Sequence, residues 1–309
     1  MFENFKRHCN WRMKYYLIHL LSLLKNFEKK QRIIVFGSGR SGTNLLASFL
    51  NTIQNTVEIE EPLMNSSSKE IDKIGFTGWG QYIPESSDWQ EAKLFFRKFF
   101  AGIEMNPNHY AGDIWDLVKA DYFIYRFIRA NLLMPWLILN FDILNPIFLI
   151  RNPYAVIASQ LQHPGFGGNK PLYLEQKATT RNFKYYKEFY IKYEKKFNNS
   201  KRIEEVLIIK WLMENEYVVS HKWHNVKWLS VNYEDLIGKP ELVRKKINTK
   251  IGLNIPSRAN DIIKLPSKSV VTKLERDQII KHRKYLSEEQ ADIISENLTN
   301  SIFNNIYSF

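Results

Sequence analysis

The sequence is poor in cysteine, and its first apolar stretch is short. Cys9 is the one cysteine among 309 residues, which excludes an intramolecular disulfide framework and fits a reducing compartment or a fold that needs no disulfide. Residues 15–24 form an apolar stretch of about ten residues, whereas a membrane-spanning helix needs about twenty. No small-residue cleavage site follows, so we expect neither a membrane span nor a secretory signal, and we expect a cytoplasmic protein.

Internal repeats, low-complexity tracts and long linkers rich in proline, glycine or serine are also missing. We therefore expect a single domain over residues 32–309, preceded by a basic amphipathic helical segment at residues 1–31. Lysines and arginines flank the apolar part of this segment, and one helical face carries Leu17, Leu20, Leu21 and Leu24. Two interpretations remain open: the helix packs on the domain, or it is an anchor in peripheral contact with a membrane surface.

Acidic side chains are outnumbered by basic ones. The chain has 44 lysines and arginines against 32 aspartates and glutamates, a formal net charge of +12. Such a chain attracts anions, whether nucleotides, nucleic acid, anionic glycans or a membrane surface. No arginine-rich recognition helix or aromatic RNA-binding strand pattern is present, so we expect no nucleic-acid partner. The sequence leaves the oligomeric state open.

Apolar strands alternate with helices along the chain. The patterns predict strands at residues 33–36, 56–59, 146–150 and 226–232, and helices at residues 44–53, 89–100, 153–160, 203–223 and 239–251, with helix-compatible spacing at 120–139. This alternation predicts an α/β fold with a P-loop-like, mostly parallel β-sheet flanked by helices on both faces. Ligands of such sheets bind beyond the carboxyl ends of the strands.

A glycine-rich turn follows the first buried strand at residues 37–44, Gly-Ser-Gly-Arg-Ser-Gly-Thr-Asn. Closely spaced glycines let several backbone N–H groups converge, and the start of the next helix adds its partial positive charge, so the turn suits an anion such as phosphate. A nucleotide-triphosphatase loop needs a lysine where this chain has Thr43. The cation inside the turn is Arg40, whose planar guanidinium can clamp a phosphate without magnesium.

A second candidate anion site follows the strand at residues 146–150. Arg151 comes directly after this strand, and Ser159 lies two turns along the helix that Pro153 begins. An arginine and a hydroxyl facing one groove suit a second phosphate. Two such sites indicate a ligand with phosphates at both ends of a nucleoside.

These motifs resemble those of the sulfotransferases that use 3′-phosphoadenylyl sulfate (PAPS). Residues 37–44 are similar to the family's 5′-phosphosulfate loop, in the Arg-Ser-Gly-Thr form of carbohydrate and bacterial members, and residues 150–159 are similar to its 3′-phosphate motif, with Asn152 in place of the common aspartate. Weaker similarities lie at residues 211–217, 231–236 and 281–287, and in the last His282 stands where relatives often have tryptophan. The resemblance runs from about residue 33 to residue 298.

The resemblance implies that PAPS is the sulfonate donor, that adenosine 3′,5′-bisphosphate (PAP) is the product, and that no metal takes part. It implies that Arg40 stabilises the charge that grows on the leaving 5′-phosphate, and that Arg151 and Ser159 hold the 3′-phosphate. The other residues implied in donor binding are Gly39, Ser41, Gly42, Thr43, Asn44 and, from the C-terminal loop, Arg283.

The resemblance also suggests a general base. Carbohydrate sulfotransferases with an Arg-Ser-Gly loop often carry a Glu-Pro pair about twenty residues later, which Glu61 and Pro62 match. A partly buried carboxylate could take the proton of an acceptor hydroxyl as the new S–O bond forms. The neighbouring Glu60, and His109 and His163, are alternative bases.

We therefore expect a PAPS-dependent sulfotransferase (EC 2.8.2 type) that sulfates a hydroxyl on a glycan, a glycolipid or a small hydroxylated molecule. Lys119, Arg126 and Arg129 could meet an anionic acceptor or lie on a solvated helix face, and residues 164–168 could form a lid or an ordinary loop. One alternative is a degenerate P-loop kinase or nucleotide hydrolase. Another is a basic module that binds nucleic acid or a membrane.

Overall fold

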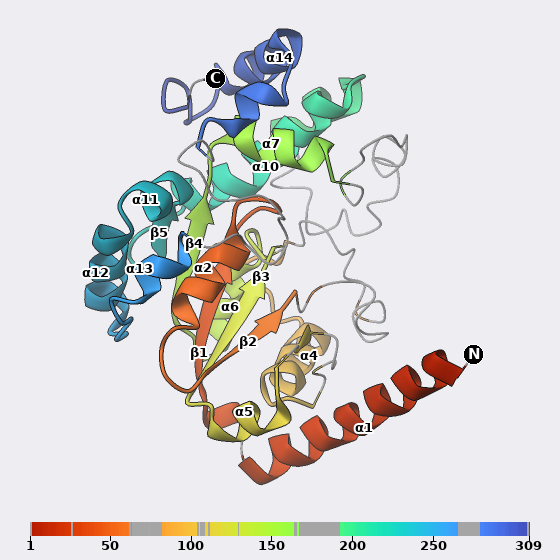
Figure 1. Cartoon of the computed structure of the whole chain (residues 1–309). Helices are drawn as coiled ribbons and strands as arrows, with labels where there is room; N and C mark the ends of the chain where they lie inside the picture. The colour runs from red at the N-terminus through yellow and green to blue at the C-terminus, as the bar shows by residue number, and fades with distance from the viewer. Residues whose placement is uncertain are drawn as a thin grey trace.

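A five-stranded parallel sheet forms the centre of the part of the chain that the structure describes (Figure 1). The computed structural model describes residues 2–25, 27–61, 63, 74, 82–103, 105, 109–110, 112–128, 130–163, 166, 192–264, 279–307 and 309. The strands are β1 (Gln31–Phe36), β2 (Thr56–Glu60), β3 (Tyr122–Phe127), β4 (Leu144–Ile150) and β5 (Leu229–Asn232), in the spatial order β2-β3-β1-β4-β5. The α/β fold class predicted from the sequence is confirmed.

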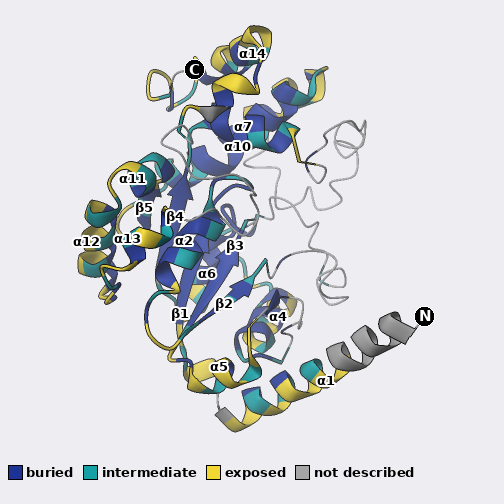
Figure 2. Cartoon of the chain, viewed as in Figure 1, coloured by how far each residue is buried: buried dark blue, intermediate teal, exposed yellow. Residues whose placement is uncertain are grey.

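Helices cover both faces of the sheet, which buries the central strands on both sides (Figure 2). One face packs against α2 (Thr43–Leu50), α11 (Tyr233–Gly238), α12 (Pro240–Ile251) and α13 (Ala259–Ile262). The other packs against α4 (Gln90–Phe100), α6 (Met134–Asn140) and α10 (Ile203–Ser220), through a core rich in phenylalanine and tryptophan. Further helical elements are α1 (Phe2–Lys25), η1 (Phe27–Lys29), α5 (Ile114–Lys119), α7 (Pro153–Leu161), η6 (Lys281–Lys284) and α14 (Glu288–Leu298).

The helix predicted from the spacing at residues 120–139 was wrong for the first part of this segment. Residues 122–127 form β3, which lies between β1 and β2 with Ile34 opposite Tyr125, and only residues 134–140 are helical. A strand buried on both faces reads as a continuous apolar run with no period of two. Its aromatic residues therefore fit a helical spacing as well as a strand, and pairing with both neighbours decides in favour of the strand.

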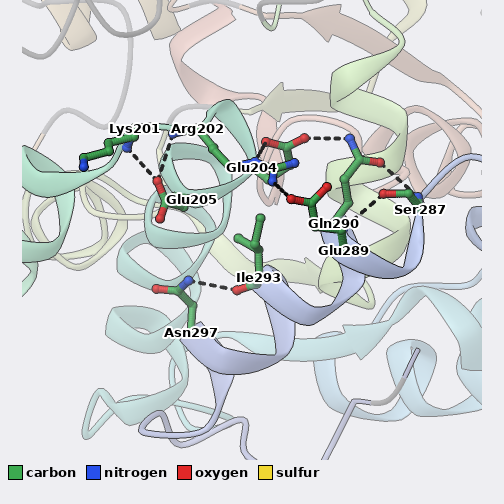
Figure 3. A network of polar contacts seen from close by, with 9 residues as sticks. All are labelled: Lys201, Arg202, Glu204, Glu205, Ser287, Glu289, Gln290, Ile293 and Asn297. Carbon is green, nitrogen blue, oxygen red and sulfur yellow. Dashed lines mark hydrogen bonds and ion pairs between the residues drawn. The ribbon is translucent and has the colours of Figure 1, made fainter.

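The C-terminal helix α14 is attached to the start of α10 by a polar network (Figure 3). Gln290 donates from Nε2 to Oε1 of Glu204 at 2.6 Å, and Arg202 pairs with Glu289. The same Gln290 accepts from the backbone N–H of Ser287 at 3.0 Å, while Ser287 Oγ accepts from the N–H of Gln290 at 3.2 Å. This reciprocal capping box begins α14 beside α10.

The N-terminal helix α1 packs on α5, at the end of the sheet where the strands begin (Figure 1). Ile18 and Ser22 are buried there, and Lys14 donates from Nζ to the carbonyl oxygen of Tyr110 at 2.5 Å. Among the described residues, no helix is long and apolar enough to cross a bilayer. Apart from Phe166, residues 164–168, for which the sequence left a lid or an ordinary loop open, lie outside the described residues, as do Arg129 and the expected strand-ending Pro62.

Candidate anion-binding site

The glycine-rich turn connects β1 to α2 at the carboxyl edge of the sheet. Backbone bonds fold the turn tightly: Gly37 N donates to Phe127 O at 3.3 Å, and Ser41 N donates to Ser38 O at 3.0 Å. Gly42 is the N-cap of α2 with φ of 97°, and it has no side chain to cap the first helical turn. The first N–H groups of α2, those of Thr43 and Asn44, therefore receive no side-chain cap and can serve an anion, whereas those of Leu45 and Leu46 donate to Gly42 O.

Two glycines of the turn are required by close packing. A Cβ on Gly37 would lie 2.5 Å from the carbonyl oxygen of Leu149, and one on Gly42 would lie 2.5 Å from the ring of Tyr233. Real Cβ atoms do not approach other atoms so closely, and the φ of Gly42 is one that residues with a Cβ rarely adopt. The turn therefore sits directly against β4 and the start of α11.

Arg40 connects the turn to the helix that follows β4. Its Nε donates to Oγ of Ser159 at 3.0 Å, and its own carbonyl oxygen accepts from Nη1 of Arg151 at 3.2 Å. Gln160 adds a third connection, from Nε2 to the carbonyl oxygen of Gly39 at 2.8 Å. The structure thus brings together Arg40, Arg151 and Ser159, which the sequence placed in two separate motifs.

Arg40 and Arg151 bring two positive charges close together at this site. Burial, and then the nearby charge of Arg151, lower the pKa of the Arg40 guanidinium. Two buried polar atoms at the site, Oγ of Ser41 and Nε of Arg151, have no hydrogen-bond partner among the described residues. Buried polar atoms normally have partners, so these two atoms are candidate contacts for an anion. The residues therefore fit a phosphate group.

Arg151 and the neighbouring Asn152 contact Tyr233 and Glu234, two residues that were not predicted from the sequence. Its guanidinium lies 4.2 Å from the centre of the Tyr233 ring, a cation–π contact. Glu234 accepts from the backbone N–H of Asn152 at 3.0 Å, and Asn152 Oδ1 in turn accepts from Tyr154 N at 2.9 Å. Asn152 therefore caps α7, a role that asparagine fills as well as aspartate does. The available signal was the weak similarity at residues 231–236.

Asn215 contacts the glycine-rich turn, and it too was not predicted from the sequence as a residue of the site. From α10, its Nδ2 donates to Oγ of Ser38 at 2.9 Å and to the carbonyl oxygen of Trp211 at 2.6 Å. Both Asn215 and Ser38 are buried. The sequence signal was the weak similarity at residues 211–217.

Arg283 lies near this site but points its guanidinium elsewhere. It is on η6, which packs against α7, where His282 stacks on Tyr154 with ring centroids 6.2 Å apart. Burial lowers the pKa of His282, and the charges of Arg283 and Arg151 add to that effect. The Nη2 of Arg283 donates to the carbonyl oxygen of Phe309 at 2.8 Å. The η6 segment is thus close to Arg151, while the described contact of Arg283 is with the end of the chain.

Glu61 follows β2, and its carboxylate contacts a buried arginine of β3. Arg126 pairs with Glu61 through Nη1, with Glu58 at 3.0 Å from Nε and with Glu60 at 3.1 Å from Nη2. Burial works to lower the pKa of Arg126, but the charges of Glu61, Glu58 and Glu60 outweigh it and raise that pKa. Arg126 is therefore neither on a helix nor solvated. Lys119, by contrast, is exposed on α5.

The two alternative histidines lie in different surroundings. His109 is buried, and burial lowers its pKa against the opposing effect of Glu60, whose backbone it contacts. His163 is exposed just after α7, and burial and then the charge of Arg40 lower its pKa. His163 is thus beside the anion site, whereas His109 is beside the end of β2. Within the described residues, no three histidine, cysteine, aspartate or glutamate side chains gather as metal ligands would.

Comparisons with known proteins found likenesses among solved structures alone. No family model matches the chain, and no curated protein matches it. The sulfotransferase domain of the Synechococcus PCC 7002 olefin synthase is 14% identical with a TM-score of 0.45, covering 87% of this chain and 95% of that one. The sulfotransferase domain of the curacin biosynthetic pathway is 14% identical with a TM-score of 0.47, covering 86% and 97%. Mouse sulfotransferase SULT7A1 complexed with PAP is 15% identical with a TM-score of 0.43, covering 93% and 90%. At this distance the function has to be argued from the chain's own residues.

Proposed function

We propose that this protein is a sulfotransferase that moves a sulfonate group from PAPS to an acceptor hydroxyl. The observation that carries the proposal is the convergence of Arg40, Arg151 and Ser159. Beside them, Ser41 Oγ and Arg151 Nε are buried and have no hydrogen-bond partner in the part of the chain that the structure describes. Two arginines and two hydroxyls in one place suit a ligand that carries more than one phosphate group. PAPS has a 5′-phosphosulfate and a 3′-phosphate on one nucleoside, and it fits both halves of the site.

The donor would be held by two segments: the glycine-rich turn that follows β1, and Arg151 with helix α7, which follow β4. The N–H groups of Gly42, Thr43 and Asn44, the Oγ of Ser41 and the side chain of Arg40 would bind the 5′-phosphosulfate, while the N–H of Ser41 donates to Ser38 within the turn. Arg151 and Ser159 would bind the 3′-phosphate, and we retain Arg283 as a contact that forms when the donor binds. Binding of the 3′-phosphate would free Arg40 from Ser159 for the leaving group.

In the reaction, the acceptor oxygen forms a bond to sulfur as the bond from sulfur to the 5′-phosphate oxygen breaks. Negative charge then grows on the 5′-phosphate, where Arg40 and the N–H groups would stabilise it. The acceptor proton would pass to a carboxylate, for which we propose Glu61, held by Arg126. The products are PAP and a sulfated acceptor, which we propose to be a saccharide or glycoconjugate hydroxyl.

Calorimetric titration with PAP, in the absence of magnesium, tests the donor site. A hydrogen bond to a charged group contributes about 1.5–3 kcal/mol, so Arg40→Ala and Arg151→Ala should each weaken PAP binding by about tenfold or more. Arg97→Ala, at an exposed arginine of α4, is the matched control and should bind like the wild type. Absence of PAP binding to the wild type would sink the proposal, and magnesium-dependent ATP turnover would favour a P-loop kinase or hydrolase instead.

A transfer assay tests the base and the acceptor. With labelled PAPS and a panel of glycans, glycolipids and small phenols, we expect transfer to saccharide hydroxyls. Glu61→Gln should lower kcat by about 10²-fold or more with PAP affinity unchanged. Glu60→Gln is the matched control, because Glu60 contacts the same arginine. A loss of kcat in Glu60→Gln instead of Glu61→Gln would assign the base to Glu60, and sulfation of phenols alone would overturn the saccharide assignment.

A further inference from the structure

The N-terminal helix α1 exposes a continuous row of large apolar side chains, which we call the apolar stripe. Its six members are between 39% and 69% exposed: Met13, Tyr16, Leu17, Leu20, Leu23 and Leu24. Steps of three and four residues place them on one side of the helix, over a length of about 17 Å. Isolated exposed leucines are normal on protein surfaces, but a contiguous row of this kind marks an interaction surface.

The opposite side of α1 is fixed to the body of the protein. Ile18 is fully buried, Ser22 is buried, and Lys14 donates to the carbonyl oxygen of Tyr110. At 100° per residue, Ile18 and Ser22 lie nearly half a turn from the centre of the apolar stripe, and Lys14 lies about a third of a turn from it. The helix therefore cannot bury the stripe by rolling over without losing these contacts, and the stripe stays directed away from the domain.

The charge around the stripe identifies the occupant. Residues 1–30 contain seven lysines and arginines and two glutamates. Of the basic residues with described side chains, Arg12 precedes the stripe and Lys29 follows it, and both are exposed. A second copy of the chain would bring two such basic segments together, and they would repel one another. An anionic lipid surface attracts basic residues and receives apolar side chains at its headgroup boundary.

We infer that the apolar stripe of α1 docks this protein on an anionic lipid bilayer surface, with α1 lying parallel to it. Docking leaves the anion-binding site open, because α1 lies at the end of the sheet where the strands begin and the site lies at the other end (Figure 1). The exposed Trp115 lies on α5, the helix against which α1 packs. Aromatic residues of this kind are common at the membrane interface. The exposed Asp113 and Asp116 at α5 and Glu28 on η1 oppose the attraction, so the basic residues of the segment 1–30 must outweigh them.

Flotation of the full chain with lipid vesicles tests this inference. Vesicles of phosphatidylcholine with about 30% phosphatidylserine should carry the protein, pure phosphatidylcholine vesicles should not, and binding should fall as NaCl rises from about 0.05 to about 0.5 M. Leu20→Glu should weaken vesicle binding at least tenfold. The matched control is Leu242→Glu, which places the same charge on a leucine of α12 that is 61% exposed, and it should bind like the wild type. Replacing Arg12 and Lys29 by glutamine should weaken binding and flatten its salt dependence.

Three results would overturn the inference: no flotation with anionic vesicles, equal flotation with neutral ones, or equal losses in Leu20→Glu and Leu242→Glu. A wild type that sediments as a dimer, and that Leu20→Glu converts to a monomer without any vesicle binding, would assign the stripe to a second copy. PAP titration of Leu20→Glu separates the two proposals. The variant should keep wild-type PAP affinity, so the membrane contact and the donor site can each fail independently.

Discussion

Replacing Gly42 by alanine probes the packing that connects the glycine-rich turn to Arg151. Gly42 has φ of 97°, and a Cβ there would lie 2.5 Å from two ring carbons of Tyr233. The same ring supports the guanidinium of Arg151 at 4.2 Å. An added methyl group must therefore displace the Tyr233 ring, and the displacement is transmitted to Arg151.

The magnitude follows from two separate costs. A left-handed backbone costs a residue with a Cβ about 1–2 kcal/mol. Overpacking a closely packed site costs about 1–3 kcal/mol more. We therefore expect Gly42→Ala to lower the free energy of unfolding by about 2–5 kcal/mol. Gly252 is a matched control, because its φ is 75° and nothing lies within 4 Å of its added Cβ. Gly252→Ala should cost the backbone strain alone.

Urea unfolding followed by tryptophan fluorescence measures both variants, and calorimetric titration with PAP measures the effect on the site. Gly42→Ala should be the less stable variant and should bind PAP at least tenfold more weakly than the wild type. Gly252→Ala should keep wild-type PAP affinity. Equal destabilisation by the two alanines would show that the clash with Tyr233 is absent, and unchanged PAP affinity in Gly42→Ala would refute the connection to Arg151.

Three further predictions concern stability. Arg126→Ala leaves three neighbouring carboxylates without their buried partner and should lower the free energy of unfolding, measured with urea, by about 3–5 kcal/mol. Arg97→Ala, at an exposed arginine, should lower it by less than about 0.5 kcal/mol. Similar losses in the two variants would contradict the burial of the Arg126 charge. Ser287→Ala removes the capping box of α14 and should cost about 1 kcal/mol, while Ser295→Ala, at an exposed position within the same helix, should be nearly neutral. Hydrogen bonds from Arg244 and Asn260 lower the pKa of Glu241 from 4.5 to about 2, so Glu241→Gln should lower Tm at pH 7. Because the folded-state pKa is the lower one, that Tm difference should shrink as pH falls below about 4.5 toward about 2, and a difference that grows on acidification would contradict it.

The sequence predicted the fold where local signals and tertiary packing agree. The turn at residues 37–42 was predictable because an apolar run followed by closely spaced glycines has few other structures. The helix at α7 was predictable because Pro153 is favoured at its first position and Asn152 caps it. The strand β3 was not predictable, because burial on both faces removes the alternation that identifies a strand.

The motifs named residues for the candidate site but not their arrangement. Arg40, Arg151 and Ser159 were found from the motifs, yet the direct hydrogen bond between Arg40 and Ser159 depends on how α7 packs against the turn. The supporting Tyr233 and Asn215 lie about 80 and 175 residues from the groups they contact, and no local pattern can indicate such pairs. The ion pairs of Arg126 could not be predicted from the sequence either, because they depend on the pairing of β2 with β3.

The most direct measurement of the central claim compares PAP with its two monophosphates, 5′-AMP and 3′-AMP, by calorimetry on the wild type without magnesium. If the two halves of the site each hold one phosphate, removing either phosphate removes at least one charge-assisted hydrogen bond, about 1.5–3 kcal/mol, and each monophosphate should bind at least about tenfold more weakly than PAP. Arg151→Ala should then reduce the affinity for 3′-AMP and leave that for 5′-AMP nearly unchanged. Equal affinity for PAP and 5′-AMP would contradict a second phosphate site at Arg151 and Ser159.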